Sequence, residues 1–288
     1  MKHIAFIDMD DTLLGPTKSI SPENLRALDR LRAADVEIVI ATGRHRRNVT
    51  GYQAEMGDFE WLVSSHGAVV ESLRTGEVLH ELFLPSSSIP DICRRGREEG
   101  VGLMVYHRTG IYTEEMTEWV ARHASRIGQE PVVRDFSTFP AEEFQKVMWT
   151  KNSESISALA APLAKEFAGK VQVLRTEPEL LEFFSTSVNK SVGAQALIAS
   201  KGVPQSRTLA FGDGSNDVEL LGWAGISVAM AHGHKGARQA AQHVTPTAPP
   251  ETAFAHAVEI ALRAMEARAG SAPSGRGIEL AATHASMF

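Results

Sequence analysis

Carboxylates stand close together near the start of this sequence, where Asp8 and Asp10 directly follow the apolar residues 4–7. An apolar run without polar alternation is typical of a strand that is buried on both faces of a parallel sheet. Because side chains alternate along a strand, Asp8 and Asp10 should leave its carboxyl end on the same side. Two like charges this close repel each other, which lowers the stability of the fold unless a cation or a shared proton offsets the repulsion. The competing interpretation is an acidic turn, since Asp is common where a strand passes into a loop.

Three further polar groups follow apolar runs or open a helix. They are Thr42 with Gly43, Lys190, and Asp213 with Asn216 and Asp217. Carboxylates at two strand ends, Asp8 and Asp213, are where a hard cation such as Mg²⁺ would be held. The hydroxyl of Thr42 and the ammonium of Lys190 are groups that neutralise the charge of a phosphoryl group. Asp10 can serve as a proton donor to a leaving oxygen. Each of these residues also has a structural interpretation as a turn, cap or surface residue.

The elements that must position these groups alternate between strand and helix. Strands are predicted at residues 4–7, 36–41 and 61–64, with a helix after each of the first two and a helix start at Ser21 and Pro22. The alternation resumes with a helix from Lys190 and a strand at 208–211. This order predicts an α/β fold with a doubly wound, mainly parallel sheet, which binds ligands at the carboxyl ends of its strands.

The segment 81–183 has shorter and more mixed elements, which predicts an inserted α+β domain with its own small core. His107 and Arg108 fall in a predicted hairpin turn of this domain and are expected to be exposed. The α/β core would then comprise residues 1–80 and 184–269. The tail at 270–288 is rich in Ala, Ser and Gly, which predicts a flexible or accessory segment.

Composition sets outer limits on the function. The net charge of −6 over 288 residues argues against a nucleic-acid partner, whose binding surface would be basic. No apolar run approaches the roughly 20 residues that span a bilayer, and the start of the chain does not resemble a signal peptide. The single cysteine, Cys93, excludes an internal disulfide, and we interpret it as a buried helix residue rather than a nucleophile. We therefore expect a cytoplasmic protein, a monomer or a homodimer, with no membrane partner.

Taken in order, these motifs resemble those of the haloacid dehalogenase superfamily. They are DxDxT at residues 8–12, a threonine at the end of the second strand (Thr42), a later lysine (Lys190), and GDxxND at residues 212–217. The sequence is most similar to the Cof-like, sugar-phosphatase-type branch, in which a large cap is inserted between the second and third motifs. The resemblance covers about residues 3–245, with the cap matched in position and size rather than by motif.

The resemblance implies a Mg²⁺-dependent phosphomonoester hydrolase acting on a small phosphorylated metabolite, foremost a sugar phosphate. Asp8 would be the nucleophile that forms an aspartyl-phosphate, and Asp10 would protonate the leaving alkoxide and then deprotonate the attacking water. The residues predicted to serve the metal are Asp8, Asp10 through its backbone carbonyl, Asp213 and Asp217. The residues predicted to hold the phosphate are Thr42, Gly43, Lys190 and Asn216.

Two further residues are candidates for substrate contact. Arg44 follows the threonine motif, although an arginine at a surface helix start would look the same. His66 stands where the branch usually has Asn before a glycine. A second departure places His232 and His234 where the branch usually has Gly-Asn-Ala, and two loop histidines without a third ligand are more often surface residues than a metal pair. These departures concern the substrate rather than the phosphoryl chemistry.

Three other functions are compatible with parts of the pattern. A phosphosugar mutase would use the same Asp8 intermediate, and a catalytically silent phosphometabolite-binding protein would keep the fold without turnover. A phospho-accepting signalling module also uses paired carboxylates, a threonine and a lysine, but it lacks the long insertion and the late cluster at residues 212–217.

Overall fold

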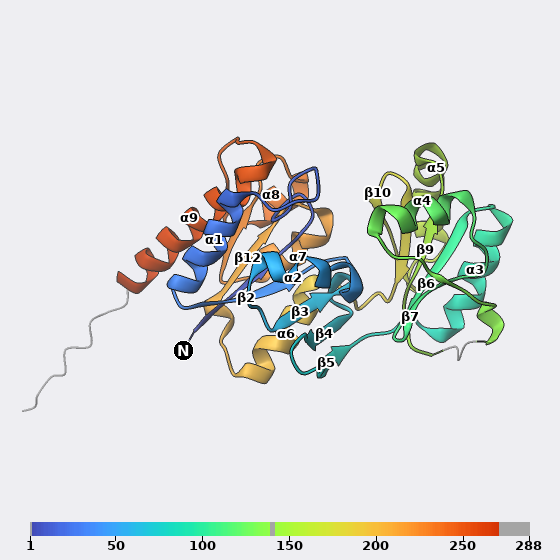
Figure 1. Ribbon diagram of the computed structural model, residues 1–288, viewed down its shortest axis with the longest axis horizontal. Coiled ribbons are helices and arrows are strands. Elements are labelled where there is room, and N and C mark those ends of the chain that lie inside the picture. The colour runs from blue at the N-terminus through green and yellow to red at the C-terminus, as the bar shows by residue number, and fades with distance from the viewer. Residues whose placement is uncertain (1, 139–141, 271–288) are drawn as a thin grey trace, which may run out of the picture.

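The computed structural model describes residues 2–138 and 142–270, and Figure 1 shows that they form two bodies joined side by side. The larger body is built on an eight-stranded sheet and the smaller one on a six-stranded sheet. The predicted α/β fold with an inserted α+β part is confirmed. The predicted tail lies outside the described residues, apart from Gly270 at the end of the last helix.

The larger sheet has the order β14-β13-β12-β1-β2-β3-β4-β5. Its strands are β1 (His3–Ile7), β2 (Val36–Ala41), β3 (Trp61–Ser64), β4 (Val69–Ser72), β5 (Val78–Glu81), β12 (Thr208–Gly212), β13 (Ile226–Ala229) and β14 (His243–Val244). All neighbouring pairs are parallel except β3–β4 and β4–β5. Because β1 lies between β12 and β2, the three loops that carry the carboxylate and threonine motifs leave the sheet at the same edge.

Helices cover both faces of this sheet. One face packs on α1 (Pro22–Ala33) and α9 (Pro250–Gly270), which run beside each other in Figure 1. The other face packs on α6 (Lys190–Lys201), α7 (Val218–Trp223) and α8 (Lys235–Ala240). The β1 side chains alternate between the two layers, Ile4 and Phe6 in one and Ala5 and Ile7 in the other, and all four are fully buried. This two-sided burial is the physical reason for the uninterrupted apolar run at the start of the chain.

The connection from β2 to β3 departs from the predicted alternation. The helix expected there is reduced to two turns of 3₁₀ helix and α2 (Gln53–Met56). Gly57 ends α2 with a positive φ of 76°, a conformation that suits glycine. The antiparallel strands β4 and β5 were not predicted, and they lead the chain toward the smaller body.

The smaller sheet has the order β10-β11-β9-β6-β7-β8. Its strands are β6 (Gly102–His107), β7 (Gly110–Thr113), β8 (Val132–Val133), β9 (Phe144–Thr150), β10 (Gln172–Glu177) and β11 (Leu180–Phe184). Its helices are α3 (Ile89–Glu98), α4 (Glu118–Ile127) and α5 (Ser153–Glu166). One face of the sheet packs on α3 and α5, and α4 packs on the other through Val120.

The prediction for His107 was wrong. The residue ends β6 and is 4% exposed, with its ring at 5.4 Å from that of Phe144 and 6.3 Å from that of Tyr112. The turn between β6 and β7 is shorter than predicted, because His107 pairs directly with Gly110. Arg108 at the turn is exposed, as predicted.

Candidate active site

Lys190 contacts both the end of β1 and the loop after β12. It begins α6, where the side chain of Asn189 caps the helix by accepting from Val192 N. The Lys190 ammonium is fully buried and donates to Asp8 and, at 2.6 Å, to Asp217 Oδ1. Burial alone would lower the pKa of Lys190, but the two carboxylates outweigh it and raise the pKa above its usual value. The lysine is therefore a fixed positive charge beside Asp8 and not a solvated surface residue.

Asp217 and Asp213 shape the loop after β12. Asp217 is fully buried, and its Oδ2 accepts from the backbone N–H groups of Asp213 at 3.1 Å and Gly214 at 2.8 Å. Asp213 Oδ1 accepts from the hydroxyl of Thr12 at 2.7 Å, which joins the first motif to the last across 201 residues. Burial, followed by the nearby charge of Asp217, raises the pKa of Asp213 to about 7.

Asp8, Asp213 and Asp217 form a group with the composition of a site for a hard cation. One carboxylate oxygen from each lies within 4.8 Å of the others. The pKa of Asp8 is raised well above its usual value, first by burial and then by the charges of the neighbouring carboxylates, against which Lys190 acts. Lys190 brings one positive charge to three carboxylates, so negative charge remains in excess. Oxygen donors crowded in this way fit Mg²⁺ or another divalent ion of the same preference.

Asp10 faces a different pair of partners. Arg44 binds its carboxylate in a fork, with Nε 2.8 Å from Oδ2 and Nη2 2.7 Å from Oδ1, and Lys18 Nζ lies 2.9 Å from Oδ1. Burial alone would raise the pKa of Asp10, but Arg44 and Lys18 outweigh it and hold the pKa at about 2. The Arg44 guanidinium also lies over the ring of Tyr52, 5.3 Å from its centroid. The predicted substrate contact Arg44 is therefore, in this state, a partner of Asp10.

Thr42 and Gly43 follow β2, and both are shaped by the neighbouring loop after β3. Thr42 is 1% exposed, its hydroxyl accepts from Arg44 N–H at 3.1 Å, and its carbonyl accepts from His66 N–H at 3.0 Å. A side chain at position 43 would collide with His66, because a Cβ there would lie 2.4 Å from Cε1 of that ring. Glycine is required at position 43 by the close approach of the imidazole.

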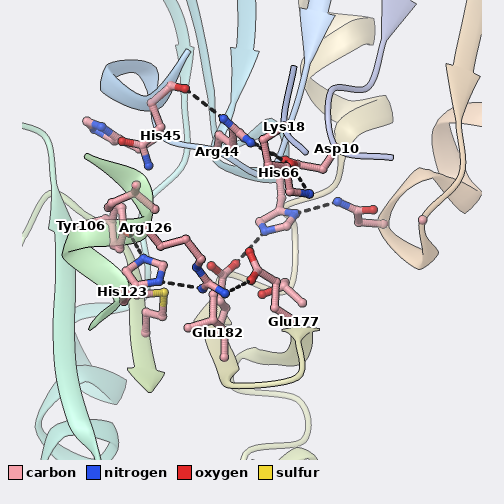
Figure 2. A pocket seen from close by; sticks show the side chains of 18 of the residues that line it. Asp10, Lys18, Arg44, His45, His66, Tyr106, His123, Arg126, Glu177 and Glu182 are labelled. Atoms are coloured by element: carbon pink, nitrogen blue, oxygen red, sulfur yellow. Dashed lines mark hydrogen bonds and ion pairs between the residues drawn. The ribbon is translucent and has the colours of Figure 1, made fainter. Parts of the chain in front are cut away.

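His66 is one of the residues through which the larger body contacts the smaller one. Its Nε2 lies 2.7 Å from Glu182 Oε2, its Nδ1 lies 3.2 Å from Asn216 Nδ2, and its ring stacks on Phe184 with centroids 5.1 Å apart. Figure 2 shows the ring between Glu182 and the core loops. Asn216, predicted as a phosphate ligand, contacts this histidine.

The smaller body places a second polar layer opposite the carboxylates. Lys146 Nζ donates to Glu182 Oε1 at 2.7 Å and to the Gly43 carbonyl at 3.3 Å, and both side chains are about 95% buried. Lys146 also lies over the ring of Tyr106, 4.5 Å from its centroid. Burial alone would raise the pKa of Glu182, but Lys146 and His66 outweigh it and lower the pKa to about 2.

A chain of polar contacts continues along α4. Tyr106 Oη lies 3.5 Å from His123 Nε2, whose Nδ1 accepts from Arg126 at 3.0 Å, and Arg126 Nη1 lies 2.6 Å from Glu177 Oε2. Burial and the nearby charge of Arg126 lower the pKa of His123 to about 4. Figure 2 shows these side chains together on the side of the pocket that faces Asp10.

A cavity of about 680 Å³ lies between the two layers. Its walls on the larger body include Asp8, Asp10, Arg44, His66, Asp213 and Asn216. Its walls on the smaller body include Tyr106, His123, Arg126, Lys146, Glu177 and Glu182. A small molecule bound here would touch the carboxylates on one side and the polar layer on the other.

The residues of the smaller body were not among the predicted site residues. A signal for two of them was present in the sequence, because Lys146 and Glu182 are the single charged residues of the mainly apolar segments 144–150 and 180–184, which form β9 and β11. A charge in a buried strand needs a partner. His232 and His234 behave as predicted surface residues. His232 lies 2.8 Å from the Asp11 carbonyl, and His234 caps α8.

Comparison with known proteins gives consistent results. A family model described as haloacid dehalogenase-like hydrolase matches residues 5–258. YxeH of Bacillus subtilis (strain 168) is 27% identical over 265 residues, covering 90% of this chain and 97% of that protein. The HMP-PP phosphatase of Serratia proteamaculans (strain 568) is 28% identical over 233 residues, covering 81% and 85%. Within the described residues, no helix has the length and apolar character to cross a membrane.

Two solved structures share the fold. A haloacid dehalogenase-like hydrolase from Bacteroides thetaiotaomicron superposes with a TM-score of 0.78 at 24% identity, covering 90% of this chain and 99% of that one. A sugar phosphatase of HAD subclass IIB superposes with a TM-score of 0.74 at 21% identity, covering 93% and 99%. At these identities the likeness is one of architecture.

Proposed function

This chain belongs to the haloacid dehalogenase-like hydrolases and is a phosphatase of small phosphorylated molecules, and from that premise we propose that it hydrolyses sugar-phosphate monoesters with Mg²⁺ through a phosphoaspartate on Asp8. The observation that carries the proposal is the position of Asp8. It lies at the end of β1, opens into the cavity, accepts from Lys190 and stands within 4.8 Å of Asp213 and Asp217 through single carboxylate oxygens.

The reaction divides into two displacements at phosphorus. In the first, an Asp8 oxygen attacks the phosphorus, the ester P–O bond breaks, and the leaving alkoxide takes a proton from Asp10. In the second, Asp10 takes a proton from water, the water oxygen attacks phosphorus, and the bond to Asp8 breaks to release inorganic phosphate. Two easier steps thereby replace one difficult one.

In the structure, the Asp10 carboxylate is in the ionised form that a general base requires. Its carboxylate is ionised and bound by Arg44 and Lys18, whereas a proton donor needs a pKa nearer to the working pH. We propose that the phosphate of the substrate attracts Arg44 and Lys18 away from Asp10, which raises the pKa of that carboxyl and allows it to protonate the leaving group. Lys190, Thr42, Gly43 and Asn216 are proposed to hold the phosphoryl oxygens.

The carboxylates of Asp8, Asp213 and Asp217, with the Asp10 backbone carbonyl, would hold Mg²⁺. When bound, the ion supplies positive charge for the phosphoryl oxygens in the transition state. The excess negative charge of the three carboxylates supports this assignment.

The substrate class rests on the polar layer of the smaller body. Its charges are paired, Lys146 with Glu182 and Arg126 with Glu177, so this wall favours a neutral, hydroxyl-bearing leaving group over a second anionic group. The names of two similar proteins, a sugar phosphatase and an HMP-PP phosphatase, point to small phosphorylated metabolites. We further propose that residues 1–80 and 184–269 form the core, that residues 81–183 form the cap, and that the protein works in the cytoplasm as a monomer or homodimer.

The first experiment is phosphate release from a panel of sugar phosphates, with Mg²⁺ and with chelator. Asp8→Asn is the blank, and Asp11→Asn, the same change at an exposed neighbour, is the matched control. Metal-dependent release that only Asp8→Asn abolishes is the expected result. Labelled phosphate found on a second position of the sugar instead of free in solution would indicate a mutase. If folded protein releases no phosphate from any substrate, the result would favour a phosphometabolite-binding protein without turnover.

Asp10→Asn tests the proton carrier. We expect kcat to fall by about 10²- to 10⁴-fold, the usual contribution of a positioned acid–base group. Quenched reactions with labelled substrate should then show whether the phosphoenzyme forms slowly or accumulates. Unchanged turnover in this variant would exclude Asp10 from the proton transfers.

A further inference from the structure

His66 is held in one orientation by its surroundings. Its backbone is in the left-handed region, with φ at 60° and ψ at 21°, where a histidine needs local support. Its ring is flanked by the space that glycine leaves at position 43 and by the ring of Phe184, which stacks on it at an interplanar angle of 17°. The imidazole nitrogens therefore point in fixed directions.

The two hydrogen bonds of this ring determine its tautomer. The side-chain amide nitrogen of Asn216 only donates, so Nδ1 of His66 must be the acceptor. The ring proton of the neutral imidazole is then on Nε2, which donates to Glu182 Oε2. Burial lowers the pKa of His66, which agrees with a neutral ring.

The two partners of His66 belong to different bodies. Glu182 is on β11 of the smaller body, where its other oxygen accepts from Lys146 on β9. Asn216 is in the loop after β12, next to Asp217 of the carboxylate group. One continuous set of hydrogen bonds thus runs from the polar layer opposite the carboxylates, through His66, to a loop that carries two of them.

We propose that His66 is a positioning residue that couples the smaller body to the catalytic loop, by donating to Glu182 and accepting from Asn216 at the same time. The proposal rests on the proposed function and adds to it a hydrogen-bonded connection between the smaller body and the loop after β12. A leaving group that contacts the smaller body would hold Glu182 in place against His66. Through the second hydrogen bond of that ring, it would also fix the orientation of the Asn216 amide. Binding energy from a remote part of the substrate would then appear as turnover at phosphorus.

Three substitutions separate the two hydrogen bonds. His66→Asn keeps an acceptor at the place of Nδ1 and loses the contact with Glu182, and Asn tolerates the left-handed backbone well. His66→Gln keeps a donor at the place of Nε2 and loses the contact with Asn216. His66→Phe keeps the stacking on Phe184 and loses both contacts.

The kinetic test compares p-nitrophenyl phosphate, whose ring must occupy the side of the smaller body, with acetyl phosphate, which is too small to reach it. For His66→Asn we expect kcat on p-nitrophenyl phosphate to fall about tenfold, the size of one hydrogen bond to a charged group, with acetyl phosphate changed less than about twofold. His66→Gln and His66→Phe should lower kcat on both substrates, because Asn216 loses its partner in each.

A matched control changes another contact between the bodies. Arg108→Gln removes the ion pair between Arg108, which is half exposed, and the largely buried carboxylate of Glu81 at the end of β5. Neither residue contacts His66. This variant should leave the ratio of the two kcat values unchanged. The proposal is overturned if His66→Asn and His66→Gln lower both kcat values equally, or if Arg108→Gln shifts the ratio as much as His66→Asn does.

A spectroscopic test is independent of turnover. The protein is labelled with ¹⁵N-histidine, and the signals of His66 are assigned among the 11 histidines by their loss in His66→Asn. The expected pattern is a neutral ring with a bare Nδ1 and a protonated Nε2 at neutral pH. The opposite tautomer, or a charged ring, would refute the coupling. If the tautomer is as expected and no phosphate ester is hydrolysed, the proposed function fails while the hydrogen-bond assignment stands.

Discussion

Arg44 and Asp10 form a two-bond fork, with 2.8 Å from Nε to Oδ2 and 2.7 Å from Nη2 to Oδ1. The two residues come from the loops after adjacent parallel strands, β2 and β1, which brings them to the same edge of the sheet. Bidentate arginine–carboxylate pairs are among the strong hydrogen-bonded pairs in proteins. The fork keeps Asp10 ionised in the free protein. Asp10 can therefore take up a proton near neutral pH only if the hydrogen bonds from Arg44 are weakened or broken.

Arg44→Met should raise the pKa of Asp10 above about 2, because burial then acts with only Lys18 opposing it. The titration of ¹³C-labelled aspartate carboxyls measures the change directly. Arg46→Met is the control, since Arg46 pairs with Glu71 at 2.8 Å and not with Asp10. An unchanged Asp10 titration in Arg44→Met would mean that the fork does not determine the charge of Asp10 in solution.

Lys190→Met should strongly destabilise the fold. The substitution leaves Asp8 and Asp217 buried without their cation, and breaking a buried pair in this way costs about 3–5 kcal/mol. Urea unfolding with and without Mg²⁺ measures the loss, and Mg²⁺ should recover part of it if the three carboxylates bind the ion. Lys201→Met at the other end of α6 removes a partly exposed pair with Glu37 and a cation–π contact with Trp61, and should cost about 1 kcal/mol. Similar losses in the two variants would contradict the buried-charge argument.

Glu182 should contribute a pH-dependent part of the stability. Its pKa is lowered from 4.5 to about 2 in the folded protein, so the unfolded chain binds more protons between these values. The contribution is therefore fully present above pH 4.5 and is lost as the pH falls toward 2, by an amount on the order of 3 kcal/mol.

Urea unfolding at several pH values between 6 and 2 tests this sign. The difference in unfolding free energy between the wild type and Glu182→Gln should be large at pH 6 and should shrink as the pH falls. Glu114→Gln, which removes the pair with Arg97 at the surface, is the control and should give only a small difference at each pH. A difference that grows at low pH would refute the predicted direction.

Gly43→Ala should disturb the junction of the two bodies. The added methyl group would lie 2.4 Å from Cε1 of His66, and overpacking of this kind typically costs about 1–3 kcal/mol. Gly51→Ala, whose methyl group would have no neighbour within 4 Å, is the matched control. Thermal unfolding compares the two. Equal midpoints would mean that the imidazole moves aside freely.

The sequence by itself determined the central strands of the larger sheet and the carboxylates at their ends. The apolar runs at 4–7, 36–41 and 208–211 became β1, β2 and β12, which lie next to one another, because strands without polar alternation are stable only in the middle of a covered parallel sheet. Asp8 and Asp213 each follow such a strand, and the parallel pairing of β1 with β12 brings them to the same edge of the sheet. The short connection between β2 and β3 and the antiparallel strands β4 and β5 escaped prediction, since local patterns are weakest at short elements.

The tertiary structure alone decided which charges pair. The sequence places Arg44 after one strand and Asp10 after another, but only the folded loops show the fork between them. In the same way, Lys146 and Glu182 were visible as single charges in mainly apolar segments, while their partners Gly43 and His66 lie more than 100 residues away along the chain. The physical reason is that strand patterns fix which face a side chain is on, whereas the docking of one body on another fixes what that face touches.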